Sequence, residues 1–161
     1  MSYPQLQDVK NYLSINSTDD DFLLGLQLTQ AIKIFEELTG RVFVATTDSS
    51  RTFYSDDRAI VNRRKFNFYD DICSITSLTI NGNLIASNKY RLPFDKPYSN
   101  IELFPTSDYF FEDYSTTEDP SSFVIVGKWA YSEECPRDIF GALLRLTAWL
   151  YHQKDNAADY D

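Results

Sequence analysis

The chain has 161 residues, 43% of them hydrophobic and 24% charged, and its formal net charge is −9. This content excludes a chain too polar to fold and is enough for one buried core. No apolar run reaches the roughly 20 residues that span a bilayer, and Met1–Asp8 lacks the basic flank of a secretion signal. We therefore expect a cytosolic product with no membrane partner.

The charge is unevenly distributed. Residues 106–161 sum to −7, with four basic and eleven acidic residues, whereas residues 51–105 sum to +2. A strongly negative field repels nucleic-acid phosphates, so sequence-specific recognition of DNA or RNA is not expected. Cys73 and Cys135 have no CxxC spacing and are expected to be reduced, semi-buried thiols.

Residues 1–40 carry the patterns of two helices. Pro4 suits the first turn of a short opening helix that ends near Asn16. Thr18 and Asp21 resemble a capping box for a long helix from about Asp19 to Thr39, with Gly40 as its C-terminal cap. Helical spacing predicts one buried face made of Leu24, Leu28, Ala31, Ile32, Phe35 and Leu38.

Residues 42–131 are β-rich, with short β-branched and aromatic runs between turn residues. The Asn81-Gly82 pair predicts a tight hairpin, because both residues accept positive φ angles. The predicted strands are residues 51–54, 59–62, 75–80, 84–85, 90–93, 100–104 and 123–129.

Two segments of this middle region have two interpretations each. Residues 106–122 hold no basic residue and read as an acidic, solvated loop that includes Asp108, Glu112 and Asp113. Within it, the aromatic run Tyr109, Phe110 and Phe111 is either packed in a core or part of a protein-binding edge. The basic cluster Arg63, Arg64 and Lys65 is either a solvated strand end or a contact for an acidic partner.

A helix over residues 135–155, with Pro136 at its start, and an acidic tail over residues 156–161 complete the chain. The apolar stripe of this helix is Ile139, Ala142, Leu143, Leu146, Trp149 and Leu150. We expect one α+β domain over residues 1–161, in which the N-terminal helices and the C-terminal helix pack as a small bundle and the β-rich middle is an insertion.

Catalytic and cofactor signals are weak. His152 is the single histidine, which argues against a zinc site and against a nucleophile–histidine pair, and the five glycines form no phosphate-binding loop. The acidic doublets 56–57, 70–71 and 133–134 are adjacent residues, typical of turns rather than of a catalytic pair across a cleft. We expect no enzyme, no metal and no cofactor.

Three segments form a combined pattern: the stretch from Thr18 to Phe43 with its TGR-x-F close, the strand from Asp71 to Ile80, and the segment from Gly127 to Ser132 followed by the apolar helix after Pro136. Together they resemble the head-tail connector proteins of tailed bacteriophages. The resemblance implies a virion head-completion or adaptor protein that forms a ring, commonly twelvefold, on the portal protein after DNA packaging. The resemblance also implies that the protein assembles in the host cytoplasm and provides the platform for a stopper or tail-completion protein.

By the same resemblance, Arg145 to Asp161 form the portal-docking element, which includes Tyr151, His152 and Lys154. Removal of the residues after Leu150 should then abolish attachment to the portal and leave the fold intact. The carboxylates of Asp108, Glu112 and Asp113 would face the channel, where viral DNA slides without specific binding. Other function classes stay open: a small acidic inhibitor of a host nucleic-acid enzyme, a carbohydrate-binding module and, less favoured, a hydrolase.

Overall fold

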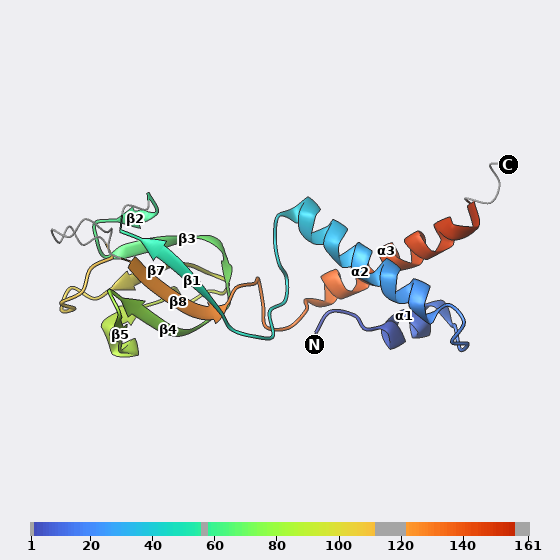
Figure 1. Ribbon diagram of the computed structural model, residues 1–161, viewed down its shortest axis with the longest axis horizontal. Coiled ribbons are helices and arrows are strands. Elements are labelled where there is room, and N and C mark those ends of the chain that lie inside the picture. Colours follow the sequence, from blue (N-terminus) through green and yellow to red (C-terminus); the bar gives the residue numbers. More distant parts are fainter. Residues whose placement is uncertain (1, 56–57, 112–121, 157–161) are drawn as a thin grey trace. The chain divides into compact units, whose positions relative to one another are not determined.

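The computed structural model describes residues 2–55, 58–111 and 122–156, and the chain divides into two compact units (Figure 1). The helical unit comprises residues 1–44 and 134–161, and the β unit comprises residues 45–133. The predicted α+β class is confirmed, with helices at both ends of the chain and a β-rich middle. No helix of the described ranges is long and apolar enough to cross a membrane.

The helical unit contains three helices: α1 (Leu6–Leu13), α2 (Asp21–Thr39) and α3 (Arg137–Asn156). Gly40 ends α2 in the left-handed conformation with φ 65°, as predicted. The predicted capping box at the start of α2 is wrong, because Asp20 occupies the cap and makes no side-chain capping bond. Its carboxylate accepts instead from Tyr151 and Lys154 of α3, and the Asp21 carboxylate pairs with Lys10 of α1.

The core of the helical unit is formed by Val9, Leu24, Leu28 and Tyr151, one or more from each helix. Two predicted core residues lie outside it. Leu38 is 81% exposed, because the buried positions of α2 end at Ala31 and its last turn extends past them. Trp149 is 58% exposed, since the buried face of α3 runs instead through Leu143, Thr147, Ala148 and Tyr151.

Thr147 explains why the stripe of α3 was misplaced. It is a polar residue in a fully buried position, and its hydroxyl donates a 2.7 Å hydrogen bond to the Leu143 carbonyl one turn earlier. This bond satisfies the hydroxyl inside the core. A pattern based on apolar residues passes over a buried threonine and selects the neighbouring tryptophan instead.

The β unit consists of two four-stranded antiparallel sheets, in the orders β1-β8-β4-β5 and β2-β3-β7-β6. Strand β3 was not predicted, and the other seven lie within about two residues of the predicted runs. A single turn of 3-10 helix, η1 (Ser87–Lys89), precedes β6. The strands are β1 (Ser49–Tyr54), β2 (Ile60–Val61), β3 (Lys65–Ile72), β4 (Ser74–Ile80), β5 (Asn83–Ile85), β6 (Tyr90–Arg91), β7 (Tyr98–Leu103) and β8 (Ser122–Lys128).

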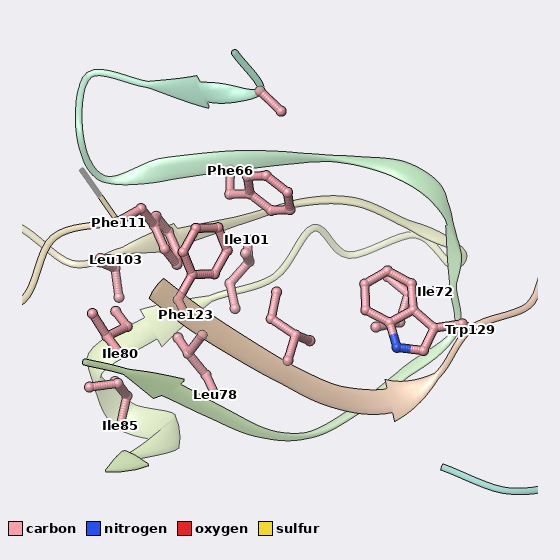
Figure 2. Packing of buried hydrophobic residues seen from close by; sticks show 12 residues of the cluster. Phe66, Ile72, Leu78, Ile80, Ile85, Ile101, Leu103, Phe111, Phe123 and Trp129 are labelled. Atoms are coloured by element: carbon pink, nitrogen blue, oxygen red, sulfur yellow. The ribbon is translucent and has the colours of Figure 1, made fainter. Parts of the chain in front are cut away.

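The core of the β unit lies between its two sheets (Figure 2). Both sheets contribute alternate residues of their strands, as period-two patterning requires. Phe66 of β3 and Phe123 of β8 meet across the core with ring centroids 4.9 Å apart in an edge-to-face arrangement. The labelled residues in the figure are Phe66, Ile72, Leu78, Ile80, Ile85, Ile101, Leu103, Phe111, Phe123 and Trp129.

The predicted Asn81-Gly82 turn is confirmed. It joins β4 to β5, with φ 50° at Asn81 and φ 78° at Gly82, and the pairing of Ile80 with Asn83 closes a two-residue loop. These are the angles of the turn type that matches the twist of a hairpin.

Candidate partner-binding surfaces

The TGR-x-F close, part of one of the segments that carry the connector resemblance, has a structural role at the end of α2. Phe43 is buried and packs on Phe35, with ring centroids 5.4 Å apart. Its backbone N–H donates a 2.9 Å hydrogen bond to the Tyr3 hydroxyl, and that hydroxyl donates to the Glu36 carboxylate. Burial, and then the Glu36 carboxylate, raise the pKa of Tyr3 above its ordinary value. The TGR-x-F close therefore fastens the chain to α2 after the Gly40 cap.

The basic cluster lies in the turn between β2 and β3. Asn62 and Arg63 both have positive φ angles, 52° and 62°, a conformation that is uncommon for residues other than glycine. Arg64 is half-buried and donates to the carbonyls of Phe104 at 2.8 Å and Ser107 at 3.1 Å. Arg63 is exposed, and Lys65 is half-buried at the start of β3. Arg64 thus serves to hold a neighbouring segment of the same chain.

That segment is the aromatic run. The guanidinium carbons of Arg63 and Arg64 lie 4.5 and 4.2 Å from the centroid of the Phe110 ring. Phe111 is buried, donates its backbone N–H to the Arg63 carbonyl at 2.9 Å, and packs with its ring centroid 4.8 Å from that of Phe123 (Figure 2). Tyr109 packs partly against the same core. These contacts hold residues 109–111, which directly precede residues 112–121 in the sequence, against the rest of the β unit.

The candidate acidic channel residues are only in part within the described ranges. Asp108 is exposed and directly precedes the fastened aromatic run. Glu112 and Asp113 lie outside the described residues. The structure therefore positions the start of the acidic segment, through Arg64 and Phe111, against the turn between β2 and β3.

The end of α3 separates into inward and outward residues. Tyr151 is buried, and its hydroxyl donates a hydrogen bond to the Asp20 carboxylate. The Lys154 ammonium donates to the same carboxylate at 3.0 Å and to the Tyr151 oxygen at 2.8 Å. The Tyr151 bond first, and then Lys154, lower the pKa of Asp20. Truncation after Leu150 would therefore remove packing residues of the helical unit as well as any docking element.

The outward side of α3 carries Arg145, Trp149 and His152, all three exposed. They recur at intervals of four and three residues, so they share one face of the helix. Arg145 and His152 were predicted as interface residues, whereas Trp149 was assigned to the core. A large exposed indole between two basic side chains is the composition of a protein-binding surface.

A second apolar surface was not predicted. Phe22 and Leu26 of α2 are 81% and 52% exposed and lie one turn apart. Neither residue falls at a position of the buried stripe of Leu24, Leu28 and Ala31. This is the signal in the sequence that indicates an outward orientation.

Metal-ligand groups and reactive cysteines are the other candidate sites among the described residues. Within residues 2–55, 58–111 and 122–156, no group of three or more His, Cys, Asp or Glu side chains is placed to hold a metal ion. Cys73 and Cys135 are free and buried, and burial raises the pKa of each thiol, which disfavours the reactive thiolate.

Comparison with known proteins identifies a likeness of fold. No protein-family model matches the chain, and no curated protein sequence matches it. A chain from the neck of an empty GTA (gene transfer agent) particle, computed with C6 symmetry, superposes with a TM-score of 0.61 and 16% identity, covering 92% of this chain and 78% of that chain. A chain from the neck of a native GTA particle, computed with C12 symmetry, gives 0.55 and 17%, covering 91% and 75%.

Proposed function

We propose that this protein is a structural subunit of the neck of a tailed phage or phage-like particle, a head-tail adaptor that forms a ring on the portal protein. The observation that carries the proposal is the fold likeness to chains of GTA necks, which extends over nine-tenths of this chain and so includes helices at both ends and the β-rich middle. Those necks were computed with sixfold and twelvefold symmetry. This supports a ring, and we propose twelve copies.

The surfaces of the molecule suit an assembly protein better than an enzyme. Large hydrophobic side chains are exposed on helices, where they gain free energy when a partner covers them. The single histidine, His152, is exposed on α3, and its contact is with the ring of Tyr151, 5.7 Å away between centroids. We propose a non-enzymatic role, in which partner proteins are the ligands and no cofactor takes part.

We propose three partner contacts for this ring. Within the predicted docking element Arg145–Asp161, Tyr151 and Lys154 bind Asp20 of the same unit, so we assign the portal contact to residues 157–161. The stopper or tail-completion protein binds at Tyr109–Phe111 and the residues that follow them in sequence. Asp108, Glu112 and Asp113 face the DNA channel, where their charge keeps viral DNA from adhering. A Glu112→Lys/Asp113→Lys variant should then retard DNA ejection, and a control variant with the same charge change at two exposed carboxylates elsewhere, Glu37→Lys/Asp95→Lys, should not.

The experiment that tests this function is an affinity purification of the tagged full-length chain from cells in which its particle is assembling, with identification by mass spectrometry. We expect the portal protein and a tail-side protein in excess over host proteins. Removal of residues 157–161 should lose the portal and retain a folded protein, because the described core of the helical unit ends at Tyr151 and Lys154. Recovery of one host enzyme without virion proteins would refute the proposal.

A further inference from the structure

Two exposed patches lie on the helical unit. The α2 patch consists of Phe22 and Leu26 with the exposed carboxylate of Asp19 three residues before Phe22. The α3 patch consists of Trp149 between the exposed guanidinium of Arg145 and the exposed imidazole of His152. Each patch therefore has an apolar centre and a charged edge. The charge is negative at Asp19 of the α2 patch and positive at Arg145 of the α3 patch.

The two patches point in different directions. Phe22 and Leu26 lie on the side of α2 opposite to Leu24, Leu28 and Ala31, since each residue turns the helix by about 100°. By the same geometry, the α3 patch lies on the side of α3 opposite to Leu143, Thr147 and Tyr151. Because α2 and α3 pack on each other through these inner sides, neither patch is able to cover the other within one molecule.

A contact between the α2 patch of one copy and the α3 patch of the next satisfies both surfaces. Phe22 and Leu26 would cover the Trp149 indole, an aromatic anchor of the kind that dominates interface energies. Asp19 would meet Arg145, so the charges at the edge would attract. A contact of the α3 patch with itself about a twofold axis would instead bring two Arg145 side chains together.

We propose that the α2 patch and the α3 patch are the two halves of a head-to-tail interface between copies of this chain. Unlike surfaces that face in different directions generate a ring when the rotation closes, whereas a self-complementary surface generates a dimer. The inference rests on the proposed neck function and identifies the contact within its ring. The ligand of each patch is a second copy of the chain.

The test uses the full chain and two single variants, Phe22→Asp and Trp149→Asp, in sedimentation velocity and native mass spectrometry over the widest attainable concentration range. Wild-type protein should form species larger than a dimer. Each variant alone should be monomeric, because it lacks one half of the interface. An equimolar mixture should form heterodimers and nothing larger, since one intact half remains on each variant.

Leu38→Asp is the matched control, because Leu38 lies on α2 and has the same 81% exposure as Phe22 but lies outside both patches. It should assemble as wild type does. A charge exchange adds a second readout: Arg145→Glu should weaken assembly at least tenfold, and Arg145→Glu combined with Asp19→Lys should restore it, an effect that salt diminishes.

Three results would overturn the inference: wild-type protein that is monomeric at every concentration, patch variants that assemble as wild type does, or variants whose mixture yields no heterodimer. Each of these leaves the neck function to be judged separately, by whether the portal protein is recovered with the tagged chain. Loss of portal recovery together with normal self-assembly would refute the neck function and retain the interface.

Discussion

The substitution Gly127→Ala should destabilise the β unit severely. Gly127 lies in β8, beside an irregularity in the pairing of β4 with β8 between Ile75 and Ser77. A Cβ atom at this position would stand 2.1 Å from the Ser74 carbonyl oxygen and 3.1 Å from the Ile75 Cα. Both are backbone atoms, so no side-chain rotation relieves the overlap. The two strands must separate instead.

The magnitude follows from this geometry. A carbon normally approaches a carbonyl oxygen to about 3.3 Å, so the overlap requires a displacement of about 1 Å. Overpacking of this kind costs about 1–3 kcal/mol, and each backbone hydrogen bond lost nearby, such as the 3.0 Å bond from Cys73 N–H to the Lys128 carbonyl, costs about 1 kcal/mol more. Alanine has a lower backbone entropy than glycine in the unfolded chain, and this difference stabilises the folded state by about 0.4–1 kcal/mol. We expect a net loss of about 3 kcal/mol.

Urea denaturation in a Trp149→Phe background measures this loss in the β unit alone. The remaining tryptophan, Trp129, is buried and donates its indole N–H to the Ser49 carbonyl at 3.2 Å, so its fluorescence reports on this unit. With a typical slope of about 1–3 kcal/mol per molar, the midpoint should fall by about 1 M or more.

Gly141→Ala is the matched control, because nothing lies within 4 Å of a Cβ at that position of α3. It should stabilise the helical unit by about 0.5–1 kcal/mol, as alanine does relative to glycine inside a helix. An unchanged urea midpoint for Gly127→Ala would refute the reasoning about close strand contact.

Three further predictions concern side-chain anchors. Tyr3→Phe leaves the Phe43 N–H without its acceptor and should cost about 1–3 kcal/mol in chemical denaturation. In the wild type, the raised Tyr3 pKa means that the stability from this group is complete below about pH 10 and is lost as pH rises further. Asp20→Asn should speed amide exchange in the last turn of α3, because the group that accepts the Tyr151 hydrogen bond loses its charge. In the wild type the Asp20 pKa is lowered, so the Tyr151–Asp20 contact should weaken as pH falls through the acidic range. Arg64→Lys should cost about 1–2 kcal/mol in thermal or urea unfolding, since a lysine does not both stack on an aromatic ring and bond two carbonyls.

Each anchor has a neighbour that serves as its control. Tyr12→Phe alters a half-exposed tyrosine of the same unit, Asp19→Asn alters the exposed carboxylate next to Asp20, and Arg63→Lys alters the exposed member of the arginine pair. Each control should change its measured quantity less than the anchor does. Equal effects within a pair would mean that the hydrogen bonds described here do not determine the difference.

Local signals predicted much of the fold. The Gly40 cap and the Asn81-Gly82 turn need only the conformation of one or two residues, and the alternation of β8 needs only its neighbours. Strand β3 was missed because its sequence, KFNFYDDI, begins with the last of three consecutive basic residues and carries two adjacent acids just before its final isoleucine, and both features locally indicate a turn. Its pairing with β2 and β7 on both sides outweighs that local preference.

The candidate sites depended on contacts that are distant along the chain. Nothing near Arg64 in the sequence shows that its partners are Phe104, Ser107 and Phe110, about 40 residues away. Likewise, the burial of Thr147 decides that Trp149 faces outward, and this depends on how α3 rotates against α2. The prediction of Arg145 and His152 as surface residues needed only that they are polar on a helix.

Whether this chain forms a ring in the neck of a particle is tested most directly by electron cryo-microscopy of that neck in purified particles. We expect density between the portal and the tail into which the helical unit and the β unit each fit, repeated twelve times, with the α2 patch of one copy against the α3 patch of the next. A neck whose density accommodates neither unit, or particles that contain none of this chain, would contradict this expectation.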